Sequence, residues 1–359
     1  MPAGVFKTRY EDEISFMKYP IHKICLAILI LFLITYPLFV SNNPYYVGFA
    51  VKIAVFFMAA IGLNMLTGLA GQISLGHAAF LAIGAYTVAY LSNNIGIIGS
   101  EMVIALPIAG LIALITGLII GIPSLRVKRL YLALTTLVFQ CAVLYVISNP
   151  KWERVLGGGW GLSVSEPAIF GIKVPSEFRD LVFYYFTVTL AFALAILASN
   201  ISRSMIGRAW KAIRDRDIAA EVLGINLFKY KLLAFMVSAF YAAIAGGIWA
   251  YYQGHVSPED FDLLLSIDFV AIILIGGLGR IVWGSLLGTF IVVSVPEIIS
   301  IWVLPILQEI NPVYAGILPP VKEVIFGILI AAFLLYESKG LVELLRKIKE
   351  YFRLWPFQY

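Results

Sequence analysis

Charged side chains are scarce in this sequence. Only 13% of its 359 residues are Asp, Glu, Lys or Arg, whereas 61% are hydrophobic. A soluble domain carries roughly 25% charged and about 45–50% apolar residues. With a mean hydropathy of +0.93, the chain has too little polar surface to coat a water-soluble globule, so lipid must be the solvent for much of it. The net charge of +5 is dispersed between apolar runs, and we expect no nucleic-acid partner.

Residues for disulfide, metal and nucleotide chemistry are also few. Both cysteines, Cys25 and Cys141, lie inside apolar runs, which argues against a disulfide framework. The three histidines are scattered without metal-ligand spacing, so we expect no metal site. No G-x-x-x-x-G-K-[ST] phosphate loop occurs, and the chain has no Gly-Lys dipeptide. The sequence therefore predicts no catalytic residue and no cofactor; if ATP drives this protein, another chain binds it. We also expect no cleaved signal peptide, because the first apolar run ends at Val40 without a small-residue cleavage site.

Long apolar runs are what the sequence has in abundance. A helix needs roughly 20 mostly apolar residues to cross the hydrocarbon of a bilayer, and this rule predicts an all-α integral membrane protein of about ten transmembrane helices. The runs near 73 and 263 adjoin glycine-rich breaks, so either could be a half-helix. The candidate spans lie near 23–40, 46–66, 73–92, 102–122, 130–148, 181–198, 231–252, 263–279, 284–304 and 323–336.

Basic residues in short loops mark the cytoplasmic side of a membrane protein. Arginine and lysine cluster in the loops after the second, third and fourth pairs of spans and in the tail. All of them fall on one side if there are ten spans and both termini are cytoplasmic. We therefore expect one transmembrane domain over 1–359. Its parts outside the bilayer would be a cytoplasmic segment 1–22, an extracytoplasmic loop 149–180, a cytoplasmic loop 199–230 and a cytoplasmic tail 337–359.

The 199–230 loop has an unusual pattern. Read as helix, 204–223 places Ile206, Trp210 and Ile213 on one face. Asp217 is the predicted N-cap of a short second helix, and Gly224 is predicted to end it, so the loop holds either two short helices or one broken helix. Two interpretations stay open: a rigid knob that receives force from a separate ATPase, with paired charges that fix register, or a helix lying on anionic lipid. The residues assigned to the knob are Arg208, Arg214, Asp215, Asp217, Ala219, Ala220 and Gly224.

Polar residues and glycines interrupt the apolar run around Gly71. Irregular backbone at membrane depth is tolerated where it lines a cavity. A helix broken near Gly71 would aim free N–H groups at a polar solute such as a carboxylate. The opposing interpretation is close helix packing, because Ser74, Ala78 and Ala82 repeat every four residues. The candidate substrate-pathway residues are Asn64, Gly71, Gln72, Ser74, Gly76, His77 and Glu297.

A second glycine segment echoes the first. Residues 71–76 and 279–284 both read G-x-I-x-x-G, which hints at the internal repeats that transporters often contain.

Two acidic residues, Asp268 and Glu297, fall within predicted spans. Intramembrane acids are functional candidates by default, and either could belong to a proton relay. That chemistry supports a competing interpretation of the chain as a proton-coupled secondary transporter, and a passive channel is another. The alternative for both residues is a structural or gate-lining role near the outer interface.

Four segments form specific motifs. They are Asn64-Met-Leu-Thr-Gly-Leu-Ala-Gly-Gln-Ile-Ser-Leu-Gly-His-Ala-Ala-Phe80 with Gly84-Ala-Tyr86; Leu125-Arg126 with Tyr131, Ala133, Thr136-Leu137 and Phe139; Gly207-Arg-Ala-Trp-Lys-Ala-Ile-Arg-Asp215 with Ala219-Ala220 and Gly224-Ile-Asn226; and Ile275-Gly-Gly-Leu-Gly279 with Trp283-Gly284. Together they resemble the LivM-type permeases of branched-chain amino acid ABC importers, a family closely related to urea and short-amide permeases. The resemblance covers about 60 to 341.

The resemblance implies a membrane-spanning permease domain that moves branched-chain amino acids inward by alternating access, with no chemistry on the substrate. The implied partners are a homologous second permease, two cytoplasmic ATPase subunits that bind the ATP, an extracytoplasmic solute-binding protein and the lipid bilayer. The implied location is a prokaryotic inner membrane. Urea, short amides and other amino acids stay open as alternative substrates. The late glycines, assigned to a gate or to packing, are Gly276, Gly277, Gly279 and Gly284.

Overall fold

The computed structural model describes residues 20–40, 43–95, 101–125, 130–169, 171–175, 178–310 and 340–354, with scattered residues between 324 and 335. Over these residues the chain is almost entirely helical. The long helices are α2 (Pro20–Val40), α3 (Pro44–Leu63), α4 (His77–Asn94), α6 (Met102–Ser124), α7 (Leu130–Ser148), α9 (Arg179–Arg203), α12 (Leu227–Gln253), α13 (Leu263–Gly276) and α14 (Ile281–Ile310), followed by α16 (Leu341–Leu354). A π-helix, η1 (Asn64–Leu69), extends α3.

Six helices of the described residues are long and apolar enough to cross a membrane. The expected all-α membrane protein is therefore confirmed at this level. The six segments are Pro44–Leu69, Met102–Ser124, Tyr131–Ser148, Arg179–Arg203, Leu227–Gln253 and Ile281–Ile301.

The two spans suspected of being half-helices both meet a break. α4 begins only at His77, and α13 has 14 residues. At 1.5 Å per residue, α13 reaches about 21 Å, which is shorter than the roughly 30 Å hydrocarbon layer. The candidate span at 323–336 lies largely outside the described residues.

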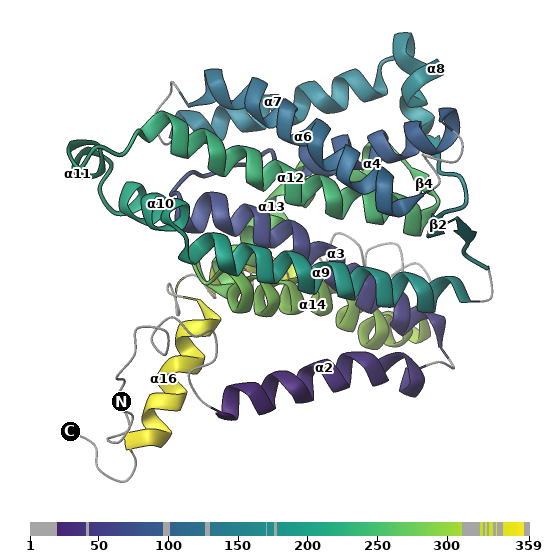
Figure 1. Cartoon of the computed structure of the whole chain (residues 1–359). Coiled ribbons are helices and arrows are strands. Elements are labelled where there is room, and N and C mark those ends of the chain that lie inside the picture. Colours follow the sequence, from purple (N-terminus) through teal and green to yellow (C-terminus); the bar gives the residue numbers. More distant parts are fainter. Residues whose placement is uncertain are drawn as a thin grey trace.

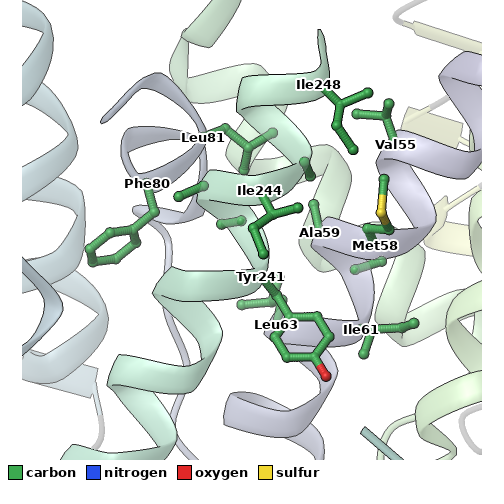
Figure 2. Close-up of a cluster of buried hydrophobic side chains, with 14 of the residues drawn as sticks. Val55, Met58, Ala59, Ile61, Leu63, Phe80, Leu81, Tyr241, Ile244 and Ile248 are labelled. Carbon is green, nitrogen blue, oxygen red and sulfur yellow. The ribbon is translucent and has the colours of Figure 1, made fainter. Parts of the chain in front are cut away.

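The core is built around α12. In its apolar window 67% of the residues are buried within the protein, against 33% for α6, which places α12 at the centre and α6 at the edge. Apolar side chains of α3, α4 and α12 meet here, among them Met58, Leu81 and Ile244 (Figure 2). Small residues bring the backbones close: a Cβ at Gly84 of α4 would collide with the carbonyl oxygen of Ala243 in α12. Such small-residue contacts drive helix packing in lipid, where apolar burial alone offers little.

The two ends of the bundle carry different structures. Two short helices, α10 (Met205–Asp215) and α11 (Asp217–Val222), lie at one end, as does α16 (Figure 1). The opposite end holds α8 (Glu153–Leu156), β2 (Ala168–Ile169) and β4 (His255–Val256). The 149–180 loop is thus separated from the 199–230 loop by the full length of the bundle.

The 149–180 loop is folded over most of its described length. It contains two single-turn 3₁₀ helices, η2 (Pro150–Trp152) and η3 (Gly158–Trp160), besides α8. Strand β1 (Leu162–Ser163) pairs antiparallel with β4, and β2 pairs with β3 (Ile172–Lys173). The β1–β4 pairing ties this loop to the α12–α13 connection, whose 3₁₀ turn η5 (Pro258–Phe261) carries a Ser257–Asp260 capping box. A loose surface loop would not show this pairing.

Candidate functional site

A first helix break separates η1 from α4. Residues 70–76 are not helical, and Gly71 takes φ +69°. L-residues with a Cβ avoid this left-handed region, whereas glycine enters it freely. The break predicted near Gly71 is therefore present. The π-helical turn just before it is a feature often found at functional sites.

A second break separates α13 from α14. It covers Gly277 to Arg280, with φ +118° at Gly277 and +79° at Gly279. Gly276 and Gly284 lie on either side, and a Cβ on Gly276 would collide with the Gly284 carbonyl oxygen. The late glycines thus allow close packing of α13 against α14 and the turn between them. Whether they also gate transport stays a prediction.

Asn64, the first residue of η1, links the segment before the first break to the second break. Its side chain is fully buried. Its Oδ1 accepts a hydrogen bond from the Gly279 amide at 2.9 Å, and its Nδ2 donates to Ser285 Oγ at 3.1 Å. A residue at the end of α3 therefore satisfies the exposed backbone of the α13–α14 turn, as a helix end buried in protein requires.

Arg214 of α10 contacts both breaks. Its Nη1 donates to the Gly68 carbonyl oxygen at 2.5 Å. A Cβ placed on Gly71 would lie 2.9 Å from Arg214 Cγ, and one on Gly279 would lie 2.8 Å from Arg214 Nη1. The two glycines that begin the G-x-I-x-x-G segments thus face the same side chain. The second glycines differ in position, because Gly76 precedes α4 whereas Gly284 lies inside α14.

Helix α10 is fixed to the bundle by Trp210. This side chain is fully buried, and its Nε1 donates to the Tyr230 carbonyl oxygen at 2.8 Å. Ile213 is buried beside it, as the predicted apolar face requires. Trp210 therefore couples α10 to the start of α12. Since Arg214 lies on the same helix, any movement of α10 should also move the Arg214 side chain.

Helix α11 points away from the bundle and exposes an apolar tip. Ile218, Val222 and Leu223 are 75%, 83% and 79% exposed. The two short helices expected in this loop are confirmed, and Gly224 ends the second with φ +85°. The expected N-cap is corrected by one residue: Arg216 occupies that position in extended conformation, and Asp217 is the first helical residue. Ala219 is exposed, whereas Ala220 is buried against the fold.

The predicted substrate-pathway residues around the first break are buried, but they differ in whether their polar side-chain atoms have a hydrogen-bond partner. Ser74 in the break and His77 at the start of α4 are both buried: His77 Nε2 lies 2.9 Å from the Ala59 carbonyl oxygen, and its ring packs edge-on against Phe269. Gln72 is also buried, but its amide nitrogen and oxygen have no hydrogen-bond partner among the described residues. Because buried amides are rarely left unpaired, Gln72 is the residue at this break that most needs a further polar partner.

Two amide groups at the start of α4 are already engaged, one just before the helix and one in its first turn. The Leu75 amide donates to Thr136 Oγ1 at 2.9 Å, and the Ala78 amide donates to Ser266 Oγ at 2.9 Å. Side chains of α7 and α13 therefore take two of the donors near the break, and whether other amides there face a solute stays a prediction. This arrangement anchors the break and leaves Gln72, not the amides of Leu75 and Ala78, as its candidate recognition group.

A tail contact missed by sequence reasoning reaches the second break. Arg280 forms an ion pair with Glu343 of α16 at 3.7 Å, and Arg346 pairs with the same carboxylate. Gly340 lies against Gly277. Nothing in the sequence links these positions, because 63 residues separate Arg280 from Glu343.

Glu297 lies apart from both breaks. It lines a cavity of about 420 Å³ between α3, α9, α12 and α14, together with Lys52, Asp180 and several aromatic side chains. The Tyr45 hydroxyl donates to Glu297 Oε1. Sequence reasoning singled out Glu297 but not Asp180, which sits at the very start of α9 and reads there as an ordinary loop acid.

These features define a multi-pass helical membrane protein with two helix breaks inside the bundle and a pair of short helices, α10 and α11, at one end. A family model described as "Branched-chain amino acid transport system / permease component" matches residues 45–334. The match covers most of the chain, and the chain belongs to this family. The resemblance drawn from the sequence motifs is thereby confirmed.

Individual relatives agree with this assignment. The LivM permease protein of the high-affinity branched-chain amino acid transport system of Escherichia coli is 34% identical over 72% of this chain and 64% of its own length. The probable LivM protein of Methanocaldococcus jannaschii is 24% identical over 80% of this chain and 90% of its own. The autoinducer 2 import permease LsrC of an Enterobacter species is 26% identical over 78% and 79%. The chain thus spans about two thirds of the E. coli relative. No solved structure matches it.

Proposed function

We propose that this chain is the permease subunit of an ATP-driven importer in a prokaryotic inner membrane, moving branched-chain amino acids inward by alternating access. One observation carries the proposal: Arg214 joins a surface helix pair to both helix breaks of the bundle. A permease without its own phosphate loop needs such a connection, because the force of ATP binding must enter from outside. The names of its relatives support the solute class.

The coupling element is α10 with α11. The apolar tip formed by Ile218, Val222 and Leu223 is exposed to water in the isolated chain, and exposed apolar groups of this kind mark docking sites. Arg208 and Asp215 are exposed on α10, and Asp217 begins α11; these charges on the same helix pair would fix the register of a docked ATPase. Nearby Trp210 and Arg214 pass the displacement inward. We therefore favour motor contact over lipid contact for this loop.

The assembly follows from the family. We expect a second permease that completes the pathway, two ATPase subunits on the α10–α11 end, and a solute-binding protein on the end formed by the folded 149–180 loop. About ten spans with both termini cytoplasmic would place α10, α11 and α16 inside, and these elements do share one end of the bundle (Figure 1). Residues 1–359 then act as one permease domain, with ATP bound only by the partners.

Reconstitution tests the mechanism directly. The four-subunit assembly in proteoliposomes, with its solute-binding protein, should accumulate labelled leucine, isoleucine and valine only when ATP is present. A matched preparation with an ATPase subunit carrying an inactivating phosphate-loop substitution should not. Uptake by permeases alone, driven by an imposed pH gradient, would establish the proton-coupled alternative; equilibration without any energy source would establish a channel. Transport of urea or a short amide in place of leucine would redefine the solute.

A further inference from the structure

Helix α16 combines an apolar face with a basic one. Its sequence, LVELLRKIKEYFRL, repeats apolar residues at the three- and four-residue spacing of a helix face. Its four basic residues and two acidic ones give the helix a net charge of +2. By the same helical period, the basic residues fall outside the apolar face or at its borders; they are Arg346, Lys347, Lys349 and Arg353. An apolar face bordered by basic residues is typical of helices that lie on a membrane surface.

Only the start of α16 packs against the bundle. Leu341 contacts the apolar core, and Gly340 just before it lies against Gly277 of the second break. Further along the helix, Leu345 and Tyr351 are 50% and 52% exposed. The described part of the protein therefore covers the first turn of the apolar face and leaves these two later side chains half exposed.

The direction of α16 fits a location at the membrane surface. The helix starts beside α13 and α14, at the end of the bundle that carries α10, and it runs across the long helices rather than along them (Figure 1). Because the long helices cross the bilayer, a helix that leaves their end sideways lies along the bilayer surface. In the proposed topology this is the cytoplasmic surface, where anionic lipids attract lysine and arginine.

We propose that α16 binds the headgroups of anionic phospholipids and that Glu343 transmits this contact to the second helix break. The apolar face enters the boundary between headgroups and acyl chains, and exposed Lys347 receives a lipid phosphate. The Glu343 side chain is only 12% exposed and pairs with both Arg280, at 3.7 Å, and Arg346. Since Arg280 directly precedes α14, a helix α16 held on the lipid also holds the turn between α13 and α14.

A cytoplasmic ATPase is the alternative partner for α16. An ATPase that approaches this end of the bundle would meet α11, which lies beyond α10, whereas α16 begins at the second break and turns sideways (Figure 1). A helix in that position would face lipid headgroups along its length. The positive charge of α16 also matches an anionic lipid surface without requiring an acidic groove on a protein.

Fluorescence of the full chain in nanodiscs tests the lipid contact. With Cys25 and Cys141 replaced by serine, Leu345→Cys carries an environment-sensitive fluorophore on the apolar face. In nanodiscs that contain phosphatidylglycerol, this label should emit at shorter wavelength and be protected from acrylamide in the water. In nanodiscs of phosphatidylcholine alone, the protection should be lost. Glu350→Cys places the same label on the polar face and should be quenched in both lipids.

Charge variants in the Leu345→Cys background separate lipid attraction from simple burial. Lys347→Gln should shift the partition of the label toward water by about fivefold, the share of one basic residue near an anionic surface, whereas Lys347→Arg should retain the native partition. Lys151→Gln makes the same change of net charge at an exposed position of the opposite end and should have no effect. Equal quenching of the Leu345→Cys label in the two lipids would overturn the lipid contact. Protection that appears only after ATPase subunits are added would also overturn it and assign α16 to the motor.

Hydrogen exchange tests the link to the second break. The Arg280 amide donates to the Gly277 carbonyl oxygen at 3.2 Å, and it should exchange more slowly in phosphatidylglycerol than in phosphatidylcholine. Glu343→Gln should abolish this lipid dependence while the Leu345→Cys label stays protected. Equal exchange of the native chain in the two lipids, or a lipid dependence that persists in Glu343→Gln, would overturn the link. None of these measurements requires transport, so an absence of ATP-driven uptake would refute the proposed function and leave the lipid contact standing.

Discussion

At the scale of single residues, Arg214 is the side chain on which coupling should depend. Arg214→Ala removes the hydrogen bond to the Gly68 carbonyl, an interaction of a charged group worth roughly 1.5–3 kcal/mol. We expect ATP-driven uptake to fall at least tenfold while ATP hydrolysis by the assembly persists, because the motor would still dock on α11. Parallel measurement of uptake and phosphate release checks this.

Lys211→Ala is the matched control for Arg214. It lies on the same helix, and its ammonium donates to the Ser202 carbonyl at 3.3 Å, away from the breaks. Uptake by this variant should match the native assembly. Equal uptake by the Arg214→Ala and Lys211→Ala assemblies would contradict a coupling role for Arg214.

Gly71 permits a second, structural test of the same contact. Gly71→Ala forces a Cβ into left-handed backbone, at about 1–2 kcal/mol, and into contact with Arg214. Thermal unfolding in detergent should show a lower midpoint for Gly71→Ala. The loss should be smaller when Gly71→Ala is made in an Arg214→Ala background, because the contact with Arg214 Cγ disappears, while the backbone strain and the contacts with Cα and Cβ of residue 214, each at 3.3 Å, remain. Strictly additive losses in this double-mutant cycle would mean that the two residues do not touch.

At the scale of elements, α11 offers two adjacent alanines with opposite environments. Ala219 is exposed and Ala220 is buried. A cysteine at Ala219, in a chain freed of its native cysteines, should cross-link to an ATPase subunit in the assembled complex. A cysteine at Ala220 is the internal control and should not. Cross-linking of neither position, in a complex shown to be intact, would remove α11 from the motor interface.

Helix α11 and the break at Gly71 show how much of the structure the sequence predicts. The ends of α11 follow from local chemistry, since only glycine ends a helix cheaply in left-handed backbone, and Gly224 was placed correctly. The predicted N-cap, Asp217, is one residue too late, because Arg216 and Asp217 both precede an apolar run and the sequence alone does not show which of them is already helical. The break at Gly71 was predictable from the glycines and polar residues that interrupt the apolar run there.

The long-range contacts could not have been foreseen from local pattern. Arg214 and Gly68 are 146 residues apart, and Asn64 and Gly279 are 215 apart. No periodicity connects such positions, because their meeting depends on how whole helices pack. For the same reason the sequence identified Glu297 as a candidate residue but did not predict the cavity that it lines. Lys52 and Asp180 line the same cavity, but they are 128 residues apart in the sequence and no local pattern pairs them.

At the scale of the whole molecule, the two ends of the bundle should face different compartments. Trp160 on the 149–180 loop is 85% exposed, and Val222 on α11 is 83% exposed. In a chain with Cys25 and Cys141 replaced by serine, Trp160→Cys should react with a membrane-impermeant maleimide on intact cells. Val222→Cys should react only after the cells are made permeable. The opposite pattern would invert the orientation, and labelling of both in intact cells would refute a sealed bundle.

The contact of one arginine with two breaks also has a consequence in time. If a different side chain contacted each break, one break could rearrange before the other. Intermediates that leak between the two compartments would then accumulate during turnover. Arg214 reduces that freedom, because it donates to the Gly68 carbonyl next to the first break and packs against Gly279 in the second, so a displacement of its side chain disturbs both. Fluorescent reporters placed beside Gly68 and beside Gly279 should therefore relax with a single common rate constant after ATP is added.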